Sequence, residues 1–398
     1  MRLHSFFPWL LSSALVAACG SSGSGSGESG DGGTSSSSGG SSGSSSGGTS
    51  GGSSGGSSGG SSGGGSGGTS GSSSGGSGGS SGGSSGGSSG GSSGGSSGSS
   101  SGGGAASCGG TTCAAGFSCN AAGTYCVSAH GVPAFEHVFL IVMENTSESA
   151  INSSNAPYIS SLMTKYAYTK NYSTSYHPSL PNYIDIVSGS NQGLSADGTP
   201  AQYGNITAMM LGDQLDAASI TWRQYAESAG GPCMMTDSGN YATKHVPFLF
   251  FTSVSGTASK CQDRVVDYSE FATDLKAPRR FSFITPNLCD DMHGGTASCL
   301  IGSITTGDTW LKTNAGAILS ALGPMDVLFI VWDEQTGSTG GASDPMLLIP
   351  TGPLVKAGTV SNQAYTHESL LATFEEAFGV SKLANAALVP GPVNDVWK

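Results

Sequence analysis

The chain has 398 residues and a formal net charge of −12, with only 14 lysines and arginines against 26 aspartates and glutamates. This acidic balance argues against a nucleic-acid surface, because such a surface needs Lys and Arg side chains to contact phosphates. A small phosphorylated ligand is not excluded, since a buried metal ion can reverse the local field. After the first residues, no stretch is long and apolar enough to span a membrane.

Residues 1–19 have the features of an export signal that ends in a lipobox. Arg2 precedes an apolar run from Phe6 to Val16, and the sequence Leu-Val-Ala-Ala leads directly into Cys19. We therefore expect cleavage before Cys19 and lipidation of that residue. The protein would then be exported to the cell envelope, anchored by lipid in the outer membrane or at the cell surface. The alternative is an ordinary cleaved signal that contains a cysteine.

Residues 20–104 are nearly all glycine and serine. Such a segment has almost no apolar surface to bury, so nothing offsets the entropy cost of ordering it. As a flexible coil of about 85 residues, it would have a root-mean-square reach of roughly 50 Å. We interpret it as a disordered tether without chemistry of its own.

Eight cysteines follow Cys19, and an even count in an exported chain favours disulfides over metal thiolates. Four of them lie in residues 105–130, a knot too small to form a core without disulfides, and spacing does not reveal their pairing. Zinc is the competing interpretation for this knot, but the usual CxxC pairs are absent. For the other four, proximity in sequence predicts the pairs Cys233–Cys261 and Cys289–Cys299.

Residues 134–398 have the composition of an ordinary globular domain. Apolar runs predict strands at residues 137–145, 220–226, 280–287, 326–334 and 345–353. Helical spacing predicts helices at residues 156–167, 209–218 and 368–379. Strands that alternate with helices predict a layered α/β fold with a mainly parallel sheet.

Polar side chains follow three of the predicted strands, at Glu144-Asn145, Asp290–His293 and Asp333-Glu334. In α/β sheets, ligands bind outside the carboxyl ends of the strands. Buried carboxylates need a cation, and no Lys or Arg lies close in sequence to the first or third group. Together these two groups favour a hard divalent ion such as Ca²⁺, Mg²⁺ or Mn²⁺, with Zn²⁺ as the alternative. Without an ion, one group would cap a helix and the other would be solvated.

His177, Ser179 and Asn182 lie together in the segment HPSLPNY, where we expect a loop stiffened by prolines. A serine hydroxyl becomes a good nucleophile when a base or a metal ion stabilises its alkoxide. Beside the predicted ion, Ser179 would attack phosphorus while His177 and Asn182 donate hydrogen bonds to phosphoryl oxygens or to the leaving group. A turn without function is the first alternative. A Ser-His-Asp acyl-transfer triad is the second, but no GxSxG motif surrounds Ser179.

Three further histidines, His245, His293 and His367, lie in the segments KHVPF, DDMHGG and YTHES. A single histidine is more often structural than catalytic. Four histidines in predicted loops next to strand ends, with His177 included, instead favour a site that holds a phosphoryl group and protonates its leaving oxygen.

Six short segments of the globular part resemble the bacterial phosphoesterase family of acid phosphatases and non-specific phospholipases C, which is related to the alkaline-phosphatase superfamily. In the family's order, these segments are MENTSES, HPSLPNY, KHVPF, TPNLCDDMHGG, VWDEQTG and THESLLATFEEAFG. The resemblance covers about residues 135–379. It implies a three-layer α/β/α sandwich and a phosphoseryl or phosphothreonyl intermediate.

The same resemblance assigns roles to individual residues. It implies that Ser179 is the nucleophile. The metal ligands that it implies are Glu144, Asn145, Asp333 and Glu334. The residues that it places around the phosphate are His177, Asn182, His293, His367 and His245.

Three positions depart from the family pattern. Gly337 is followed by Ser-Thr-Gly where phospholipase members often have a DHV sequence, and Glu148 replaces a common aromatic residue. Both differences point to the compact, acid-phosphatase-like branch. Asp290 stands where histidine or asparagine is common, which leaves the substrate and the pH optimum open.

We therefore expect a metal-dependent hydrolase of phosphoric esters that acts on a phosphorylated small molecule or a phospholipid head group. We expect a monomer that contacts a membrane only through lipidated Cys19 and binds no nucleic acid. The alternatives are phospholipase C activity and a non-catalytic module that binds a surface glycan or a cell-wall polymer.

Overall fold

The computed structural model of the chain describes residues 106–337 and 344–398. The predicted signal peptide, the lipidated Cys19, the Gly/Ser tether and the Ser-Thr-Gly sequence after Gly337 lie outside these residues. Among the described helices, none combines the length and the apolar character needed to cross a membrane.

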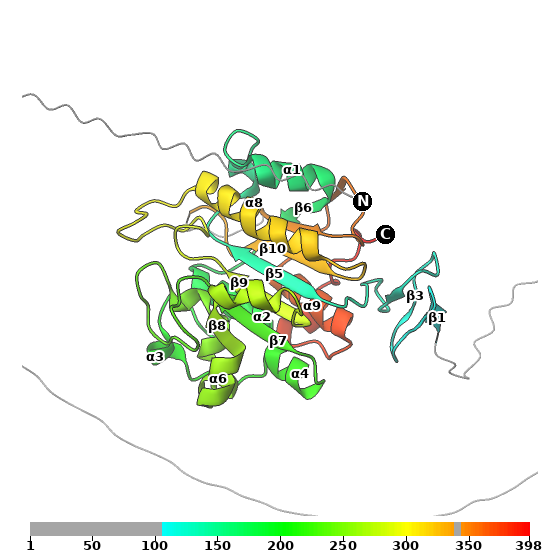
Figure 1. The fold of residues 1–398 in the computed structure, drawn as a ribbon, viewed down its shortest axis with the longest axis horizontal. Helices are drawn as coiled ribbons and strands as arrows, with labels where there is room; N and C mark the ends of the chain where they lie inside the picture. The colour runs from blue at the N-terminus through cyan, green and yellow to red at the C-terminus, as the bar shows by residue number, and fades with distance from the viewer. Residues whose placement is uncertain (1–105, 338–343) are drawn as a thin grey trace, which may run out of the picture. The chain divides into compact units, whose positions relative to one another are not determined.

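An eight-stranded sheet forms the centre of the domain (Figure 1). Within it, β11 runs antiparallel to both of its neighbours, and the other seven strands run in one direction. The predicted mainly parallel sheet is thus confirmed. In order across the sheet, the strands are β12 (Thr359–Ser361), β6 (Ala167–Tyr172), β11 (Met346–Thr351), β10 (Val327–Trp332), β5 (Val138–Met143), β9 (Phe281–Thr285), β7 (Trp222–Ala226) and β8 (Val265–Asp267).

The central strands are buried along their whole length. Every residue of β5, β9 and β10 is buried. Parallel strands covered on both faces have continuous apolar sequences, whereas half-exposed strands alternate apolar and polar residues. This explains why the sequence revealed the central strands. It missed β6 and also β8 and β12, which are only three residues long.

Helices cover both faces of this sheet. Phe139 of β5 contacts Phe271, whereas Phe281 of β9 contacts Phe374. Since Val138 pairs with Phe281 across the sheet, Phe139 and Phe281 point to opposite faces. Figure 1 shows α8 crossing in front of the strands. The α-helices are α1 (Pro157–Lys165), α2 (Ser179–Ser188), α3 (Pro200–Tyr203), α4 (Leu211–Ala217), α5 (Thr252–Ser255), α6 (Ala258–Arg264), α7 (Phe271–Asp274), α8 (Ile304–Ala321) and α9 (His367–Phe378).

The helices form two outer layers, which confirms the predicted α/β/α sandwich. On one face α1 packs against α8, and on the other α2 packs against α9 and α4. The 18-residue α8 was not predicted from the sequence. Short 3₁₀ helices lie in the connections, namely η1 (Glu148–Ala150), η2 (Thr243–His245), η3 (Pro247–Phe250), η4 (Tyr268–Glu270) and η5 (Ala384–Ala387).

The cysteine-rich segment forms two small antiparallel sheets held by disulfides. One sheet pairs β1 (Ser107–Cys108) with β2 (Thr111–Thr112), and the other pairs β3 (Ser118–Cys119) with β4 (Cys126–Val127). The disulfides join Cys108 to Cys119 and Cys113 to Cys126, so these sulfur atoms are not zinc ligands here. The pairs that sequence proximity predicted are confirmed, and they are Cys233–Cys261 and Cys289–Cys299.

The segment around Ser179 is a helix and not the loop that its prolines predicted. Helix α2 begins at Ser179, with Pro181 in its first turn. Proline is tolerated there because the first N–H groups of a helix have no intrahelical partner. Gly189 ends the helix in the left-handed conformation, with φ at 70°. The hydroxyl of Ser179 is therefore presented by the rigid N-terminus of a buried helix.

Candidate active site

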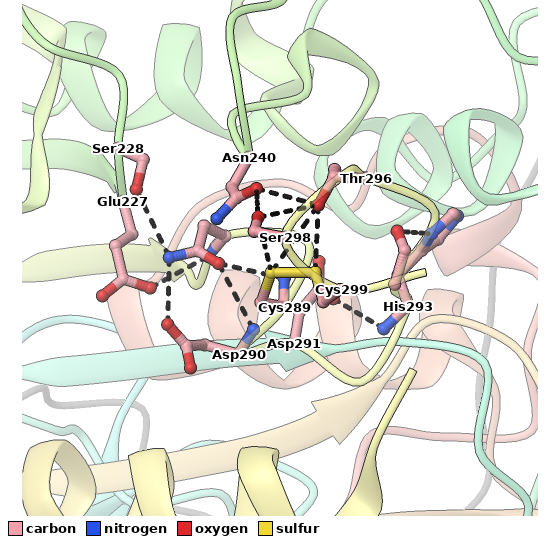
Figure 2. The surroundings of a disulfide bond; sticks show 12 residues. Glu227, Ser228, Asn240, Cys289, Asp290, Asp291, His293, Thr296, Ser298 and Cys299 are labelled. Atoms are coloured by element: carbon pink, nitrogen blue, oxygen red, sulfur yellow. Dashed lines mark hydrogen bonds between the residues drawn. A yellow bond between two sulfur atoms is a disulfide. The ribbon is translucent and has the colours of Figure 1, made fainter. Parts of the chain in front are cut away.

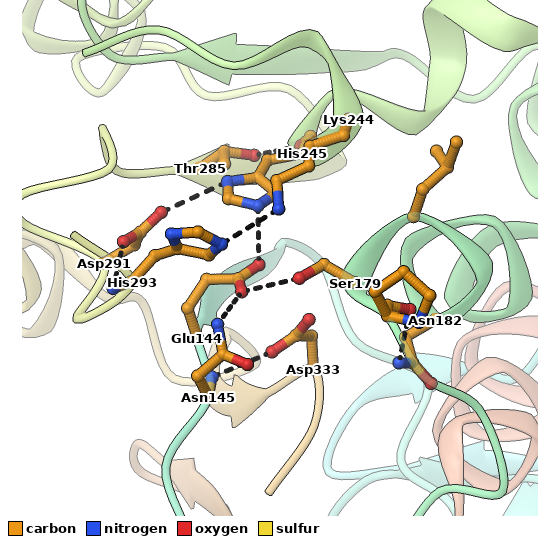
Figure 3. Close-up of polar contacts among 12 residues, drawn as sticks. Glu144, Asn145, Ser179, Asn182, Lys244, His245, Thr285, Asp291, His293 and Asp333 are labelled. Atoms are coloured by element: carbon orange, nitrogen blue, oxygen red, sulfur yellow. Dashed lines mark hydrogen bonds and ion pairs between the residues drawn. The ribbon is translucent and has the colours of Figure 1, made fainter. Parts of the chain in front are cut away.

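Neighbouring parallel strands bring the two acidic groups of the sequence together. Met143 ends β5 and pairs with Trp332, which ends β10, so Glu144 and Asp333 leave the sheet side by side. The backbone N–H of Asn145 donates to Asp333 Oδ1 over 3.2 Å. Both carboxylates are fully buried, and Figure 3 shows them facing the same small space.

Ser179 lies at the same edge of the sheet. Its Oγ donates a hydrogen bond of 2.9 Å to Glu144 Oε2, and Asn145 Nδ2 donates to the same oxygen over 3.0 Å. Ser179 is only 1% exposed. Because it is the first residue of α2, the positive end of the helix dipole acts at this point and favours an anionic group.

The side chains of His177 and Asn182 both contact Glu334. His177 Nδ1 lies 2.8 Å from Glu334 Oε2, and Asn182 Nδ2 donates to the same oxygen over 3.1 Å. Asn182 also donates to the carbonyl oxygen of Tyr176 and accepts from the hydroxyl of Thr174. Asn182 thus orients Glu334, which differs from the expected role of donor to a phosphate. His177 keeps one buried nitrogen, Nε2, without a partner among the described residues.

His367 is also placed differently from the expectation that it lines the phosphate. Its Nε2 lies 2.6 Å from the carbonyl oxygen of Asp333, and its Nδ1 lies 2.8 Å from the hydroxyl of Tyr172. The side chain is fully buried, and this burial lowers its pKa to about 4. His367 is therefore a neutral support for Asp333, with both ring nitrogens engaged.

His245 forms a buried ion pair with two carboxylates. Its Nε2 lies 3.0 Å from Glu144 Oε1, and its Nδ1 lies 3.2 Å from Asp291 Oδ2. Burial by itself lowers the pKa of His245, but the charges of Glu144 and Asp291 outweigh it and raise that pKa to about 9. Burial likewise raises the pKa of Glu144, and His245 reverses the shift and lowers it to about 2. The ring of Tyr183 stacks on His245 at 5.0 Å and fixes its plane.

A disulfide closes the loop that carries Asp291 and His293. Figure 2 shows the Cys289–Cys299 bond at the base of this loop. The Thr296 hydroxyl donates to Asn240 Oδ1 over 2.8 Å, so the loop is fastened to the segment that leads to His245. The loop also contacts β5, because the Asp291 carbonyl oxygen accepts the N–H of Glu144 over 2.8 Å. The disulfide thereby stabilises one wall of the site.

Sequence reasoning missed two charged residues of this site, which are Lys244 and Asp197, whereas Asp291 belongs to the polar group that was expected after a strand. Lys244 Nζ lies 2.9 Å from His293 Nε2 and 2.7 Å from Asp197 Oδ2. The position of Lys244 next to His245 in KHVPF was the available signal, in a chain with few basic residues. No sequence pattern pointed to Asp197.

The donor atoms of the site fit a divalent cation. Within the described residues, Asp333 Oδ2 is a buried carboxylate oxygen without a partner, and Glu144 Oε1 and Asp291 Oδ2 have only their ion pairs with His245. Burial raises the pKa of Asp333 well above its usual range, and the charges of Glu144 and Glu334 raise it further. Unpaired carboxylates are costly in a protein interior, and a bound cation removes that cost.

Histidine nitrogens add to the oxygen donors. One ligand atom from each of Glu144, His245 and His293 lies within 4.8 Å of the others. The two histidines that were expected around the phosphate are thus alternative metal ligands. A set of mixed oxygen and nitrogen donors suits Zn²⁺ or Mn²⁺ as well as the harder ions.

An α/β/α sandwich with a serine hydroxyl among buried carboxylates at the carboxyl edge of its sheet defines a hydrolase-type site. Residues 143–381 match the Phosphoesterase family, and the chain belongs to that family. It is similar to the phosphatidylinositol-3-phosphatase of Mycobacterium tuberculosis, with 33% identity over 280 residues that cover 68% of this chain and 86% of that protein. The protein is thus a hydrolase acting on phosphoric esters, which excludes the non-catalytic module.

Other similarities are more distant. A probable acid phosphatase of Kluyveromyces lactis is 26% identical over 255 residues, which cover 61% of this chain and 58% of that protein. A solved structure of an alkaline phosphatase superfamily protein from Vibrio parahaemolyticus has a TM-score of 0.46 and 10% identity, covering 62% of this chain and 67% of the other. The lipoteichoic acid synthase LtaP from Listeria monocytogenes has a TM-score of 0.44 and 9% identity, with coverage of 67% and 76%.

Proposed function

We propose that the protein hydrolyses phosphomonoesters through a phosphoserine intermediate on Ser179. The observation that supports this proposal is the hydrogen bond from Ser179 Oγ to Glu144 Oε2, beside the buried Asp333 Oδ2, which lacks a partner among the described residues. A divalent ion, which Glu144, Asn145, Asp333 and Glu334 would hold, would polarise the phosphoryl group and lower the pKa of the serine hydroxyl.

The residues of the chain then act in two displacements. In the first, Ser179 Oγ bonds to phosphorus, the bond from phosphorus to the ester oxygen breaks, and the alcohol leaves. The serine proton would pass to the leaving oxygen through His177, whose Nδ1 pairs with Glu334 and whose buried Nε2 has no hydrogen-bond partner among the described residues. In the second displacement, water attacks phosphorus, inorganic phosphate leaves, and a proton returns to Ser179 Oγ.

Replacing the nucleophile tests this proposal. In the full-length protein, Ser179→Ala should reduce hydrolysis of p-nitrophenyl phosphate by at least about 1,000-fold. Circular dichroism and metal content should stay unchanged. The matched control is Ser188→Ala, since Ser188 is buried in the same helix and, among the described residues, its hydroxyl bonds to nearby backbone and Gln192 only. Acid quenching of the wild type with ³²P-labelled substrate should trap phosphate on Ser179, and retained activity of the alanine variant would refute its role.

A phospholipid head group is the second substrate class to test. The relative from M. tuberculosis is named for a phosphorylated lipid, and phospholipase C activity is the related alternative that the family resemblance suggested. The two activities differ in the bond that breaks. A phosphatase releases inorganic phosphate from a phosphoinositide, whereas a phospholipase C releases a phosphorylated head group from a diester such as phosphatidylcholine.

We also propose that lipidated Cys19 anchors a monomeric enzyme in the cell envelope, with the Gly/Ser segment as the tether. The supporting observation is the lipobox-like sequence that ends at Cys19. The Cys19→Ala variant should lose incorporation of labelled fatty acid and move from the membrane fraction to the soluble fraction. Continued labelling of that variant would refute the anchor.

A further inference from the structure

Lys244 is a fixed cation of the site to which the proposed reaction gives no role. Its side chain is 17% exposed, and its Nζ lies between His293 Nε2 at 2.9 Å and Asp197 Oδ2 at 2.7 Å. Figure 3 shows Lys244 and His293 next to Glu144, on the side that Ser179 faces. Lys244 Nζ thus contacts His293, a ring nitrogen of which lies within 4.8 Å of a Glu144 oxygen, and Glu144 accepts the hydrogen bond from the Ser179 hydroxyl.

Asp197 connects Lys244 to the helix that carries the nucleophile. Its Oδ1 accepts the backbone N–H of Leu180 over 3.0 Å, and its Oδ2 accepts from Lys244 Nζ. Leu180 directly follows Ser179 in the first turn of α2. One carboxylate thus sets the ammonium group and the nucleophile in fixed positions relative to each other.

Lys244 has the positive charge that a lysine side chain ordinarily carries at neutral pH, and its Nζ pairs with Asp197 Oδ2 at 2.7 Å. The buried carboxylates of Glu144 and Asp333, by contrast, would repel an arriving phosphate. A permanent positive charge at this point offsets part of that repulsion, and the offset grows with the negative charge of the substrate.

We propose that Lys244 binds a non-bridging phosphoryl oxygen and selects dianionic phosphomonoesters over monoanionic phosphodiesters, with Asp197 as its positioning residue. The inference deepens the proposed function and rests on it. A phosphomonoester carries about −1.5 to −2 charges at pH 7, whereas a diester carries one. A fixed ammonium group in a poorly solvated site therefore stabilises the monoester more strongly.

The test compares two esters on the full-length protein with Lys244→Met. The kcat/KM for p-nitrophenyl phosphate should fall by about 100-fold, as for the loss of one preorganised donor. The kcat/KM for bis(p-nitrophenyl) phosphate should fall by only about 10-fold, since the diester carries half the charge and loses about half of the interaction energy. Competitive inhibition by inorganic phosphate should weaken by about 10-fold, with unchanged metal content.

Three further variants separate charge from structure. Lys244→Arg keeps the charge and should retain most of the preference for monoesters. Asp197→Asn keeps an acceptor for Leu180 but loses the charged partner of Lys244, so it should raise KM for the monoester with little change in kcat for the diester. Lys260→Met is the matched control. Lys260 Nζ also pairs with an aspartate, Asp216 at 2.9 Å, but it lies on α6 outside the site.

Equal losses for both esters in Lys244→Met, with unchanged inhibition by phosphate, would overturn the selectivity role. Loss of bound metal in that variant would also overturn it, because the effect would then be structural. Neither outcome would argue against Ser179 as the nucleophile, because the Ser179→Ala variant tests that role separately.

Discussion

His367 holds Asp333 through the backbone and not through the carboxylate. Its Nε2 lies 2.6 Å from the Asp333 carbonyl oxygen, and its Nδ1 lies 2.8 Å from the Tyr172 hydroxyl. A carbonyl oxygen only accepts, so Nε2 carries the proton and Nδ1 accepts from the tyrosine. Both contacts are fully buried. The active-site loop after β10 is therefore fixed by a neutral histidine that α9 supplies.

We predict that His367→Ala destabilises the protein by about 1–3 kcal/mol, since it leaves a buried carbonyl and a buried hydroxyl without partners. Urea denaturation measures this change in the free energy of unfolding. His130→Ala is the control, because His130 is 55% exposed and its contact with Glu376 is worth about 1 kcal/mol or less. Equal stability of the His367 variant and the wild type would show that the contact contributes nothing.

Removing divalent ions should lower both activity and thermal stability. Without a cation, His245 is the partner of Glu144 Oε1 and Asp291 Oδ2, while the buried Asp333 Oδ2 has no partner among the described residues. We expect a chelator to abolish hydrolysis and lower Tm, and a divalent salt to restore both. Scanning calorimetry and a phosphatase assay follow the two effects.

A variant that removes one buried carboxylate provides a second test of the metal site. Asp333→Asn should raise the Tm of chelator-treated protein, because burial raises the pKa of Asp333 well above its usual range and makes the ionised form unfavourable. Each pKa unit of such a shift corresponds to about 1.4 kcal/mol of free energy between the two protonation states. The same variant should be inactive with metal present. A lower Tm of this variant in the metal-free state would contradict the repulsion inferred here.

Because of Asp185, the free energy of unfolding should fall as the pH rises. Burial, followed by the nearby carboxylate of Glu368, raises the pKa of Asp185 from 3.8 to about 9 in the folded protein. Between these values the folded state holds a proton that the unfolded chain releases, so folding is favoured at low pH and weakened towards pH 9. Asp185→Asn removes this dependence and should be more stable than the wild type at pH 8 by at least about 1 kcal/mol.

Denaturation at several pH values measures this effect. The variant and the wild type should differ little near pH 4 and increasingly above it. Glu136→Gln serves as the control, since the side chain of Glu136 is exposed. A pH-independent difference between wild type and Asp185→Asn would contradict the assignment.

The disulfide of the His293 loop should matter more for catalysis than the other disulfide of the domain. The Cys289→Ala/Cys299→Ala variant frees the loop that places Asp291 and His293, and a shift of about 1 Å at a reacting site can cost about 100-fold in rate. We therefore expect kcat to fall by roughly 10- to 100-fold. The Cys233–Cys261 bond joins a turn to α6 through Cys261, and its removal should lower Tm but leave kcat unchanged at 25 °C. Similar kcat values for the two double variants would refute the distinction.

Much of the central architecture followed from the sequence. The strands β5 and β10 were evident because a parallel strand that is buried on both faces is apolar at every position. Their polar ends at Glu144 and Asp333 were evident for the same reason, since carboxylates stand out after such a run. The strands β8 and β12 were missed because three residues are too few to show a period, and α8 was missed because its sequence is rich in threonine, alanine and glycine and has few large apolar residues.

The residue types that follow the apolar runs thus predicted the reactive groups of the site. The two predicted disulfides of the globular domain followed from proximity in sequence. The sequence could not assign the partners of each side chain, because those partners come from distant segments. His367 and Asn182 were recognised, yet only the folded chain turns them towards Asp333 and Glu334. Lys244 and Asp197 form an ion pair although they are 47 residues apart in the sequence, and no periodic pattern predicts that contact. Apolar patterning thus determines which segments are buried, whereas tertiary packing alone decides which charges meet at the edge of the sheet.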